Sequence, residues 1–365
     1  MSSREFWRAK VWACGHAIAV VSMALAWAPS PRAQSGVPRY EVDASWPKPF
    51  PDRWVLGGLG GVCVDAHDHV FLLNRQDVLE GDLNAGRLAP PIIELDAKGA
   101  LINSWGDAKL LDPRLHSCSF DADGNMWIAS SPSGMVQKYS HDGRALLFQI
   151  GTKGVLDSSD GTATGKPLNS NAARFFMPSS LFVDPGNGDV YVSDGESRNG
   201  NRRIAVIDRR GTFLRQWQPE GMQTVHCMTV SADGWVYVCN REGSRIQVYD
   251  KMGTFARNID VPWKPYTPPA DGVDSIPRAS GGSVVSIELS RDSSQRLMYV
   301  INQNNSQVEI IERASGKILS TAGRGAGHFP GQFDQPHGLA VDSQGSIYVT
   351  ENRGKRIQKF RVVSR

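Results

Sequence analysis

The stretch Gly338-Leu-Ala-Val-Asp-Ser-Gln-Gly-Ser-Ile-Tyr-Val349 is written as an apolar strand, a short polar turn and a second apolar strand. Its turn contains Asp342 and Gly345, and residues of these types tolerate the left-handed backbone conformations of tight hairpins. Five other stretches follow the same plan, namely 61–73, 117–128, 180–192, 227–238 and 286–300. Internal repeats with a period of roughly 40–50 residues are typical of propellers and related arrays.

Each repeat continues with a third strand and often a fourth, and together these strands predict the fold. A third strand follows the pair, as in 245–250 and 356–360, and a fourth often follows a glycine, as in 211–217. Short, regularly spaced strands with few helical periods indicate an all-β fold, and six units of four strands indicate a six-bladed β-propeller. The last unit stops after three strands, so we expect the spare N-terminal strand 40–46 to close its blade and protect the sheet edge.

The N-terminal residues 1–33 have the pattern of a secretory signal peptide. Arg4, Arg8 and Lys10 precede an apolar run over 17–28, which is shorter than the roughly 20 residues that span a bilayer. We therefore predict export to the periplasm or the extracellular space, with cleavage near Ala33, although an uncleaved anchor is the alternative. The remaining residues, 34–365, are predicted to form a single propeller domain, with long surface loops over 153–171 and 262–282.

The charge balance bears on the class of partner. The chain has 40 Lys and Arg and 37 Asp and Glu, and residues 1–33 contain four of the basic and one of the acidic residues, which leaves 36 of each sign. A net charge of zero gives no electrostatic attraction to nucleic acid or to an anionic membrane. We expect a monomer that acts on a small molecule or a peptide.

Four cysteines lie beyond the signal segment, each inside an expected strand: Cys63, Cys118, Cys227 and Cys239. Export permits disulfides, but the spacings match no zinc-knuckle pattern. Our interpretation is that these cysteines are buried free thiols. The alternative is a bridge between neighbouring strands, and the sequence does not assign the pairing.

Three histidines, His116, His226 and His337, occupy the same position in their repeats, five residues before the Asp or Ser that ends the first strand. The other three units have Gly60, Ser179 and Val285 at this position. First strands line the channel of a propeller, so alternate blades place three imidazoles about 120° apart at one level. Three converging imidazoles with a free fourth position form a catalytic zinc site, and other divalent first-row metals accept the same ligands. Strand capping by hydrogen bonds is the alternative role for these histidines.

Two arginines are expected beside this site. Asn74-Arg75 and Asn240-Arg241 end the second strands of the first and fourth units. A guanidinium near a metal can bind a carboxylate through two parallel hydrogen bonds. The alternative is that each arginine only braces a surface loop.

The stretch Phe333–Phe360 resembles an NHL repeat, and the chain after residue 33 resembles the peptidyl-α-hydroxyglycine α-amidating lyases. In that family three histidines bind zinc, and they match His116, His226 and His337. Its substrate-binding arginines match Arg75 and Arg241. The resemblance implies cleavage of a C-terminal α-hydroxyglycine to a peptide amide and glyoxylate at this zinc site.

The chain also departs from that family. Glu196 follows the third-unit Val-Ser-Asp-Gly, where the family has its catalytic tyrosine, and it is either a substitute general base or a solvated loop residue. The methionine two residues before the last ligand is replaced by Gln335. Gly338 replaces the Asp that is linked to structural calcium, which argues against Ca²⁺, and the family's disulfide cysteines have no counterparts.

Three functions remain open on this basis. The leading hypothesis is an exported metal-dependent lyase of the amidating type. The second is a metal-dependent hydrolase of another small carboxylate or ester on the same propeller. The third is a non-enzymatic NHL propeller that binds a partner through its loops.

Overall fold

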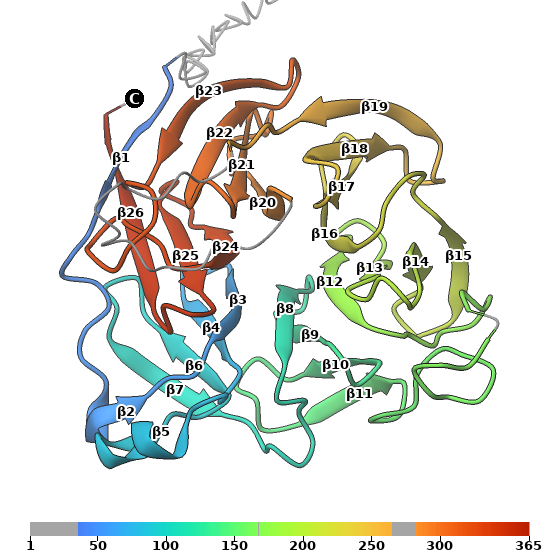
Figure 1. Ribbon diagram of the computed structural model, residues 1–365, viewed down its shortest axis with the longest axis horizontal. Helices are drawn as coiled ribbons and strands as arrows, with labels where there is room; N and C mark the ends of the chain where they lie inside the picture. Colours follow the sequence, from blue (N-terminus) through green and yellow to red (C-terminus); the bar gives the residue numbers. More distant parts are fainter. Residues whose placement is uncertain (1–35, 167, 265–281, 365) are drawn as a thin grey trace, which may run out of the picture. The chain divides into compact units, whose positions relative to one another are not determined.

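The computed structural model describes residues 36–166, 168–264 and 282–364. The predicted signal segment lies outside these ranges, as does most of the expected loop 262–282. Within the described part, six four-stranded antiparallel sheets stand around a common centre as the blades of a propeller (Figure 1). The predicted all-β, six-bladed architecture is therefore confirmed. No helix in the described ranges is long and apolar enough to cross a membrane.

The blades follow one another along the chain, and each blade begins with its innermost strand. Blades one and two consist of β3 (Leu59–Val64), β4 (Val70–Asn74), β6 (Ile92–Leu95) and β7 (Leu101–Trp105), then β8 (Leu115–Phe120), β9 (Met126–Ser130), β10 (Met135–Tyr139) and β11 (Leu146–Ile150). Blades three and four consist of β12 (Pro178–Val183), β13 (Val190–Asp194), β14 (Arg203–Ile207) and β15 (Phe213–Trp217), then β16 (Val225–Val230), β17 (Val236–Asn240), β18 (Arg245–Tyr249) and β19 (Phe255–Asp260). Blades five and six consist of β20 (Val284–Leu289), β21 (Leu297–Asn302), β22 (Gln307–Glu312) and β23 (Lys317–Ala322), then β24 (Pro336–Val341), β25 (Ile347–Glu351), β26 (Ile357–Ser364) and β1 (Arg39–Val42).

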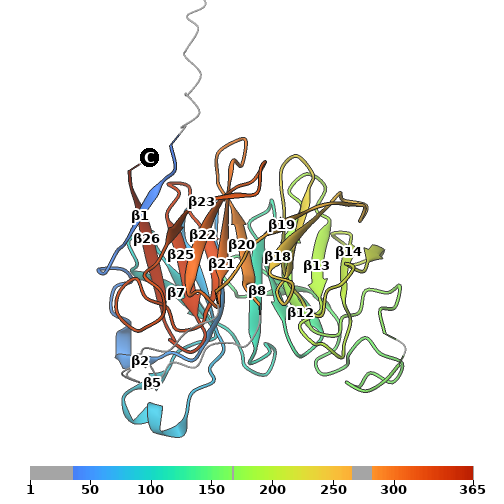
Figure 2. The ribbon, with the colours of Figure 1, turned by 45° about the horizontal axis from the view of Figure 1, so that its top comes forward.

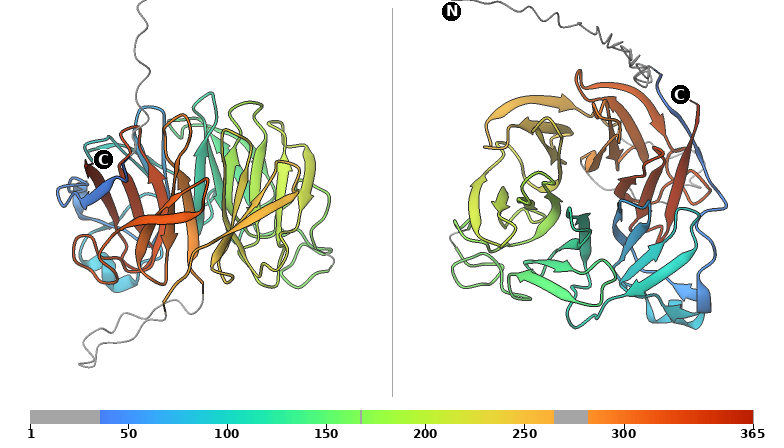
Figure 3. Two further views of the ribbon diagram at one scale, coloured as in Figure 1. Left: turned by 90° about the horizontal axis from the view of Figure 1, so that it is seen from above. Right: turned by 180° about the vertical axis from the view of Figure 1, so that it is seen from behind.

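The small elements lie around blade one. The short helices η1 (Pro51–Arg53) and η2 (Glu80–Asn84) accompany a two-stranded parallel sheet of β2 (Trp54–Val55) and β5 (Arg87–Leu88). Figures 2 and 3 show this group at the rim of the ring. The other expected loop, 153–171, connects β11 to β12, and Lys153 Nζ anchors it 2.8 Å from the carbonyl oxygen of Leu111.

Polar side chains hold the hairpin turns of the repeat. The Oδ1 atom of Asp121 accepts hydrogen bonds from the backbone nitrogens of Asp123 and Asn125, and Asp342 makes the same pair of bonds two and four residues onward. Gly124 has a φ of 78°, which a side chain would disfavour. The Asp and Gly of each turn therefore have a direct conformational role, while apolar residues on both faces of each sheet pack between neighbouring blades.

The N-terminal strand closes the ring as predicted. Strand β1 pairs with β26 in antiparallel register, with Val42 opposite Phe360. Tyr40 Oη also donates to the carbonyl oxygen of Gly345, 3.1 Å away. The strand ends at Val42, earlier than the expected 40–46, and Trp46 instead packs against Tyr348 with ring centroids 5.0 Å apart.

The interpretation of the cysteines as free thiols is wrong. Cys63 on β3 is bonded to Cys118 on β8, which joins blades one and two, and Cys227 is bonded to Cys239 within blade four. The Cα atoms are 5.9 and 5.1 Å apart, within the usual range for disulfides. Tertiary structure brings each pair onto adjacent strands, which is the alternative that the sequence left open.

Candidate metal centre

The three predicted ligands meet at the axis of the propeller. His116, His226 and His337 are the second residues of β8, β16 and β24, the first strands of blades two, four and six. Their ring centroids lie 5.0, 4.8 and 5.1 Å apart, and each residue is at least 94% buried. The near-equal separations agree with the three-fold arrangement expected from alternate blades.

A β-bulge aims each of these side chains. Pairing with the second strand of the blade passes from Leu115 to Ser117 and from Pro336 to Gly338, so the intervening histidine has no partner in the ladder. The register of β16 shifts over the range that contains His226. The same shift occurs in the other three blades at Gly60, Ser179 and Val285. A bulge re-aims a side chain, so the repeat contains six equivalent positions directed by the same irregularity.

Backbone carbonyls orient the imidazole rings. His226 Nδ1 lies 2.8 Å from the carbonyl oxygen of Val285, and His337 Nδ1 lies 2.8 Å from that of Gly60. The backbone of Ser179 also contributes to the electrostatic environment of His116, where it opposes the lowering of the pKa by burial. Each carbonyl belongs to the bulged residue of the following blade. A carbonyl oxygen accepts but cannot donate, so Nδ1 carries the proton and the lone pair of Nε2 is available to a metal.

The free nitrogens fit a metal ion. One ligand nitrogen from each histidine lies within 4.8 Å of the other two. His116 Nε2 and His226 Nε2 are buried without a hydrogen-bond partner. Burial lowers the pKa of all three imidazoles, to about 3 for His226, with neighbouring positive charge as a further cause. The rings are therefore neutral at pH 7, which is the state that binds a divalent cation.

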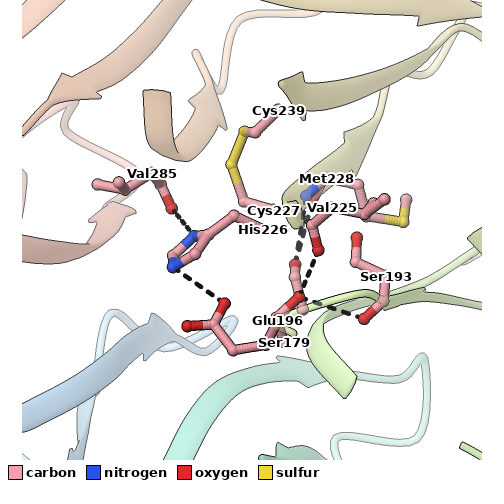
Figure 4. The surroundings of a disulfide bond; sticks show 10 residues. Ser179, Ser193, Glu196, Val225, His226, Cys227, Met228, Cys239 and Val285 are labelled. Atoms are coloured by element: carbon pink, nitrogen blue, oxygen red, sulfur yellow. Dashed lines mark hydrogen bonds and ion pairs between the residues drawn. A yellow bond between two sulfur atoms is a disulfide. The ribbon is translucent and has the colours of Figure 1, made fainter. Parts of the chain in front are cut away.

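Glu196 lies against this cluster, which excludes the alternative of a solvated loop residue. Its Oε2 is 3.4 Å from His226 Nε2 and 3.7 Å from His116 Nε2, and its side chain is 16% exposed. Figure 4 shows Glu196 and Val285 on opposite sides of the His226 ring. Burial alone would raise the pKa of Glu196, but His226, His116 and Arg241 outweigh it and hold this pKa well below the usual range.

The loop after β13 sets the position of Glu196. The Oδ1 atom of Asp194 accepts hydrogen bonds from the backbone nitrogens of Phe176 and Met177, at 2.8 and 3.0 Å. Glu196 N then donates to the carbonyl oxygen of Met177. Arg203 Nε, fully buried, binds the other oxygen of Asp194 at 3.1 Å. The backbone that carries Glu196 is thus held by a buried polar network in blade three, between the two histidine blades that its carboxylate contacts.

The two predicted arginines lie in opposite blades, one and four. Arg75 is 8% exposed, and its Nε donates to the carbonyl oxygen of Leu115 at 3.2 Å. Burial, with the charge of Arg114 in addition, lowers the pKa of Arg75 to about 10, so it remains charged at neutral pH. Its charge lowers the pKa values of His116 and His337, whereas the charge of Arg241 acts on His226 and Glu196. Both guanidinium groups therefore influence pKa values within the histidine cluster.

The asparagines of the two Asn-Arg pairs shape the loops that carry these arginines. Asn74 Oδ1 accepts a hydrogen bond from Gly57 N at 2.9 Å, and Asn240 Oδ1 accepts one from Gly243 N at 2.9 Å. Gly60 makes room for the first arginine, because an added Cβ would overlap the carbonyl oxygen of Leu115 and lie 2.6 Å from Arg75 Nε.

Asn304 is a candidate residue that our sequence analysis missed. It lies two residues after the end of β21, as Glu196 lies two residues after β13. It is 6% exposed, and both of its amide atoms lack hydrogen-bond partners. The signal was present in the repeat, because aligning the ends of the second strands places Asn304 and Glu196 at the same position.

A polar cavity extends from the histidines along the axis. Its volume is about 720 Å³, and the first strands of all six blades line it. The first strands run away from the histidines and the second strands return, so Arg75, Glu196 and Arg241 lie at the histidine end. Glu288 on β20 faces the cavity, and burial raises its pKa to about 7.

Comparisons with known proteins agree with this architecture. Residues 333–360 match the NHL repeat family. The chain is 23% identical to peptidyl-glycine alpha-amidating monooxygenase B of Xenopus laevis over 88% of its own length, but it spans only about a third (35%) of that protein. It is 26% identical to NHL repeat-containing protein 3 of Homo sapiens, covering 88% of this chain and 84% of that protein. It is 25% identical to peptidyl-alpha-hydroxyglycine alpha-amidating lyase 2 of Drosophila melanogaster, covering 71% of this chain and 57% of that protein.

Proposed function

We propose that this protein is a metal-dependent lyase similar to the peptidyl-α-hydroxyglycine α-amidating lyases. Its substrate would be a C-terminal α-hydroxyglycine or a close analogue, which it would cleave to an amide and glyoxylate. The observation that carries the proposal is the set of three buried imidazoles that face one another through ligand nitrogens, two of them oriented by backbone carbonyls. The similarity to proteins named as amidating enzymes supports the choice of reaction.

His116, His226 and His337 would hold the ion, for which zinc is the first choice and other divalent first-row metals are alternatives. Such an ion acts as a Lewis acid that stabilises negative charge on the substrate hydroxyl oxygen. Arg75 and Arg241 would bind the substrate carboxylate from opposite blades. Glu196 would accept the hydroxyl proton as the C–N bond breaks and return it to the departing amide nitrogen, a role that requires substrate binding to raise its pKa from the low value of the substrate-free site.

The experiment that tests this proposal combines metal analysis with an assay for glyoxylate. The purified protein should contain one equivalent of metal and release glyoxylate from a hydroxyglycine peptide well above the uncatalysed rate. Release at the background rate by metal-loaded protein would reject the lyase. Absence of stoichiometric metal would reject the metal site and favour a binding propeller.

Glu196 favours one further candidate, a metal-dependent hydrolase of a small carboxylate or ester. A carboxylate beside a metal ion is suited to activating water. Hydrolysis of a panel of short-chain esters by metal-loaded protein, with no release of glyoxylate, would select this alternative.

The place where the protein works is a separate proposal. The pattern of residues 1–33 and the two disulfides both suit an exported protein. Fractionation of cells that express the full chain, followed by N-terminal sequencing of the product, would test export and locate the cleavage site.

A further inference from the structure

A carboxylate oxygen and two imidazole nitrogens face one another between blades two and four. Glu196 Oε2 lies 3.4 Å from His226 Nε2 and 3.7 Å from His116 Nε2. All three atoms are buried, and none has a hydrogen-bond partner. Hydrogen bonds between charged groups are about 2.7–2.9 Å long, so these contacts are too long to be such bonds.

The position of the ring protons decides whether a hydrogen bond can form between Glu196 and these imidazoles. Because His226 Nδ1 donates to the carbonyl oxygen of Val285, His226 Nε2 has no proton to offer. His116 Nε2 is likewise buried without a hydrogen-bond partner, so no hydrogen bond links it to the carboxylate. A carboxylate oxygen that faces two bare nitrogens in a buried site is unfavourable, unless a cation lies among the three atoms.

We propose that Glu196 is a fourth protein ligand of the metal ion and binds it through Oε2 in the substrate-free enzyme. This inference rests on the metal site of the proposed function. Zinc bonds of about 2.0–2.2 Å in a tetrahedral site place neighbouring donor atoms about 3.3 Å apart, close to both separations given above. Glu196 projects from blade three, so its carboxylate meets the imidazoles of the two adjacent blades, two and four.

Ligation by Glu196 closes the position that three histidines alone would leave open. A substrate oxygen that binds the ion would then have to displace the carboxylate or enlarge the coordination shell. The displaced carboxylate would be free to accept the hydroxyl proton of the substrate, breaking that O–H bond and forming one on Glu196. Its role as a ligand in the free enzyme therefore precedes its role as a base in turnover.

The test measures metal binding to the purified protein and needs no turnover. The variant is Glu196→Gln, which keeps the shape of the side chain and removes its charge. The matched control is Glu242→Gln, because Glu242 also lies two residues after a second strand, β17, and its Oε2 accepts a hydrogen bond from Thr224 Oγ1 at 2.5 Å. Zinc affinity is measured by competition with a chromophoric chelator, and coordination by the visible spectrum of the Co²⁺-substituted protein.

We expect E196Q to lose at least about 10-fold in zinc affinity and to change the Co²⁺ spectrum, while E242Q alters neither. A wild-type spectrum and affinity in E196Q would overturn the ligand assignment and leave the proposed metal site intact. Failure of the wild-type protein to bind either ion would instead overturn the proposed function itself.

A second measurement covers the case in which E196Q does not fold. A crystal structure of the zinc-loaded wild-type protein should show Glu196 Oε2 within about 2.0–2.2 Å of the ion. An ion held by the three histidines, with solvent in place of Glu196, would overturn the assignment without any variant.

Discussion

Blades two, four and six differ from blades one, three and five at a single equivalent position. In the even blades the bulged residue of the first strand is a histidine that points a nitrogen at the axis. In the odd blades the bulged residue is Gly60, Ser179 or Val285, and the backbone carbonyls of Gly60 and Val285 orient the histidines of the preceding blades. The comparison shows how one repeated backbone irregularity supplies both the ligands and the groups that orient them.

The largest effect should come from removing an even-blade ligand. We expect His226→Ala to lower zinc affinity by more than about 100-fold, because loss of an orienting group alone typically costs 10–100-fold. Competition with a chelator measures this loss. His328→Ala is the control, since His328 is 66% exposed in a loop and should leave the affinity unchanged. Retention of wild-type zinc affinity in H226A would contradict a metal site built from the histidines of the even blades.

The next effect should come from an odd-blade position. We expect Gly60→Ala to lower the free energy of unfolding by about 2–3 kcal/mol, because the added Cβ overlaps the carbonyl oxygen of Leu115. Zinc affinity should also fall, since the carbonyl of Gly60 holds His337. Val285→Ala is the matched substitution in blade five, where the side chain shrinks and the carbonyl remains.

Denaturant unfolding and chelator competition on both variants separate the two contributions. V285A should be destabilised by about 1–2 kcal/mol with unchanged zinc affinity. A parallel loss of zinc affinity in V285A would show that side-chain packing, rather than the carbonyl, positions the histidines.

Substitution of the two arginines tests whether side chains from opposite blades bind the same substrate carboxylate. Arg75→Lys and Arg241→Lys keep the charge but remove the two-pronged geometry, so KM for a hydroxyglycine peptide should rise about 10-fold in each. Zinc affinity should not change, because neither arginine is a ligand. Steady-state kinetics measure the effect, and an unchanged KM in both variants would contradict carboxylate binding by this pair.

The smallest effect should come from Glu288 in the axial cavity of blade five. Its pKa is raised to about 7 in the folded protein, from an ordinary value of 4.5, so the folded state binds more protons between these pH values. The free energy of unfolding should therefore fall as pH rises from about 4.5 to 7, by roughly 1–2 kcal/mol for a side chain facing water in the cavity. Comparison of wild type with Glu288→Gln isolates this contribution. An identical pH dependence in both proteins would contradict the raised pKa.

Much of this organisation was predictable because a propeller repeats. Residues at the same position in different repeats occupy equivalent positions in different blades, so the convergence of His116, His226 and His337 followed from alignment alone. The pairing of Cys63 with Cys118 could not be predicted in this way, because the two residues occupy different positions in their repeats and lie 55 residues apart in the sequence. The position of Glu196 was also open, since a loop residue can point to solvent or to the axis with the same local sequence.

The sequence by itself determined the six blades, their closure by an N-terminal strand and the level of the three histidines, because these follow from strand periodicity and repeat phase. Only the tertiary structure decided which groups surround those histidines. The carbonyls of Val285 and Gly60, the guanidinium of Arg75 and the carboxylate of Glu196 come from neighbouring blades. Their distances depend on how blades pack around the axis, which no single repeat encodes.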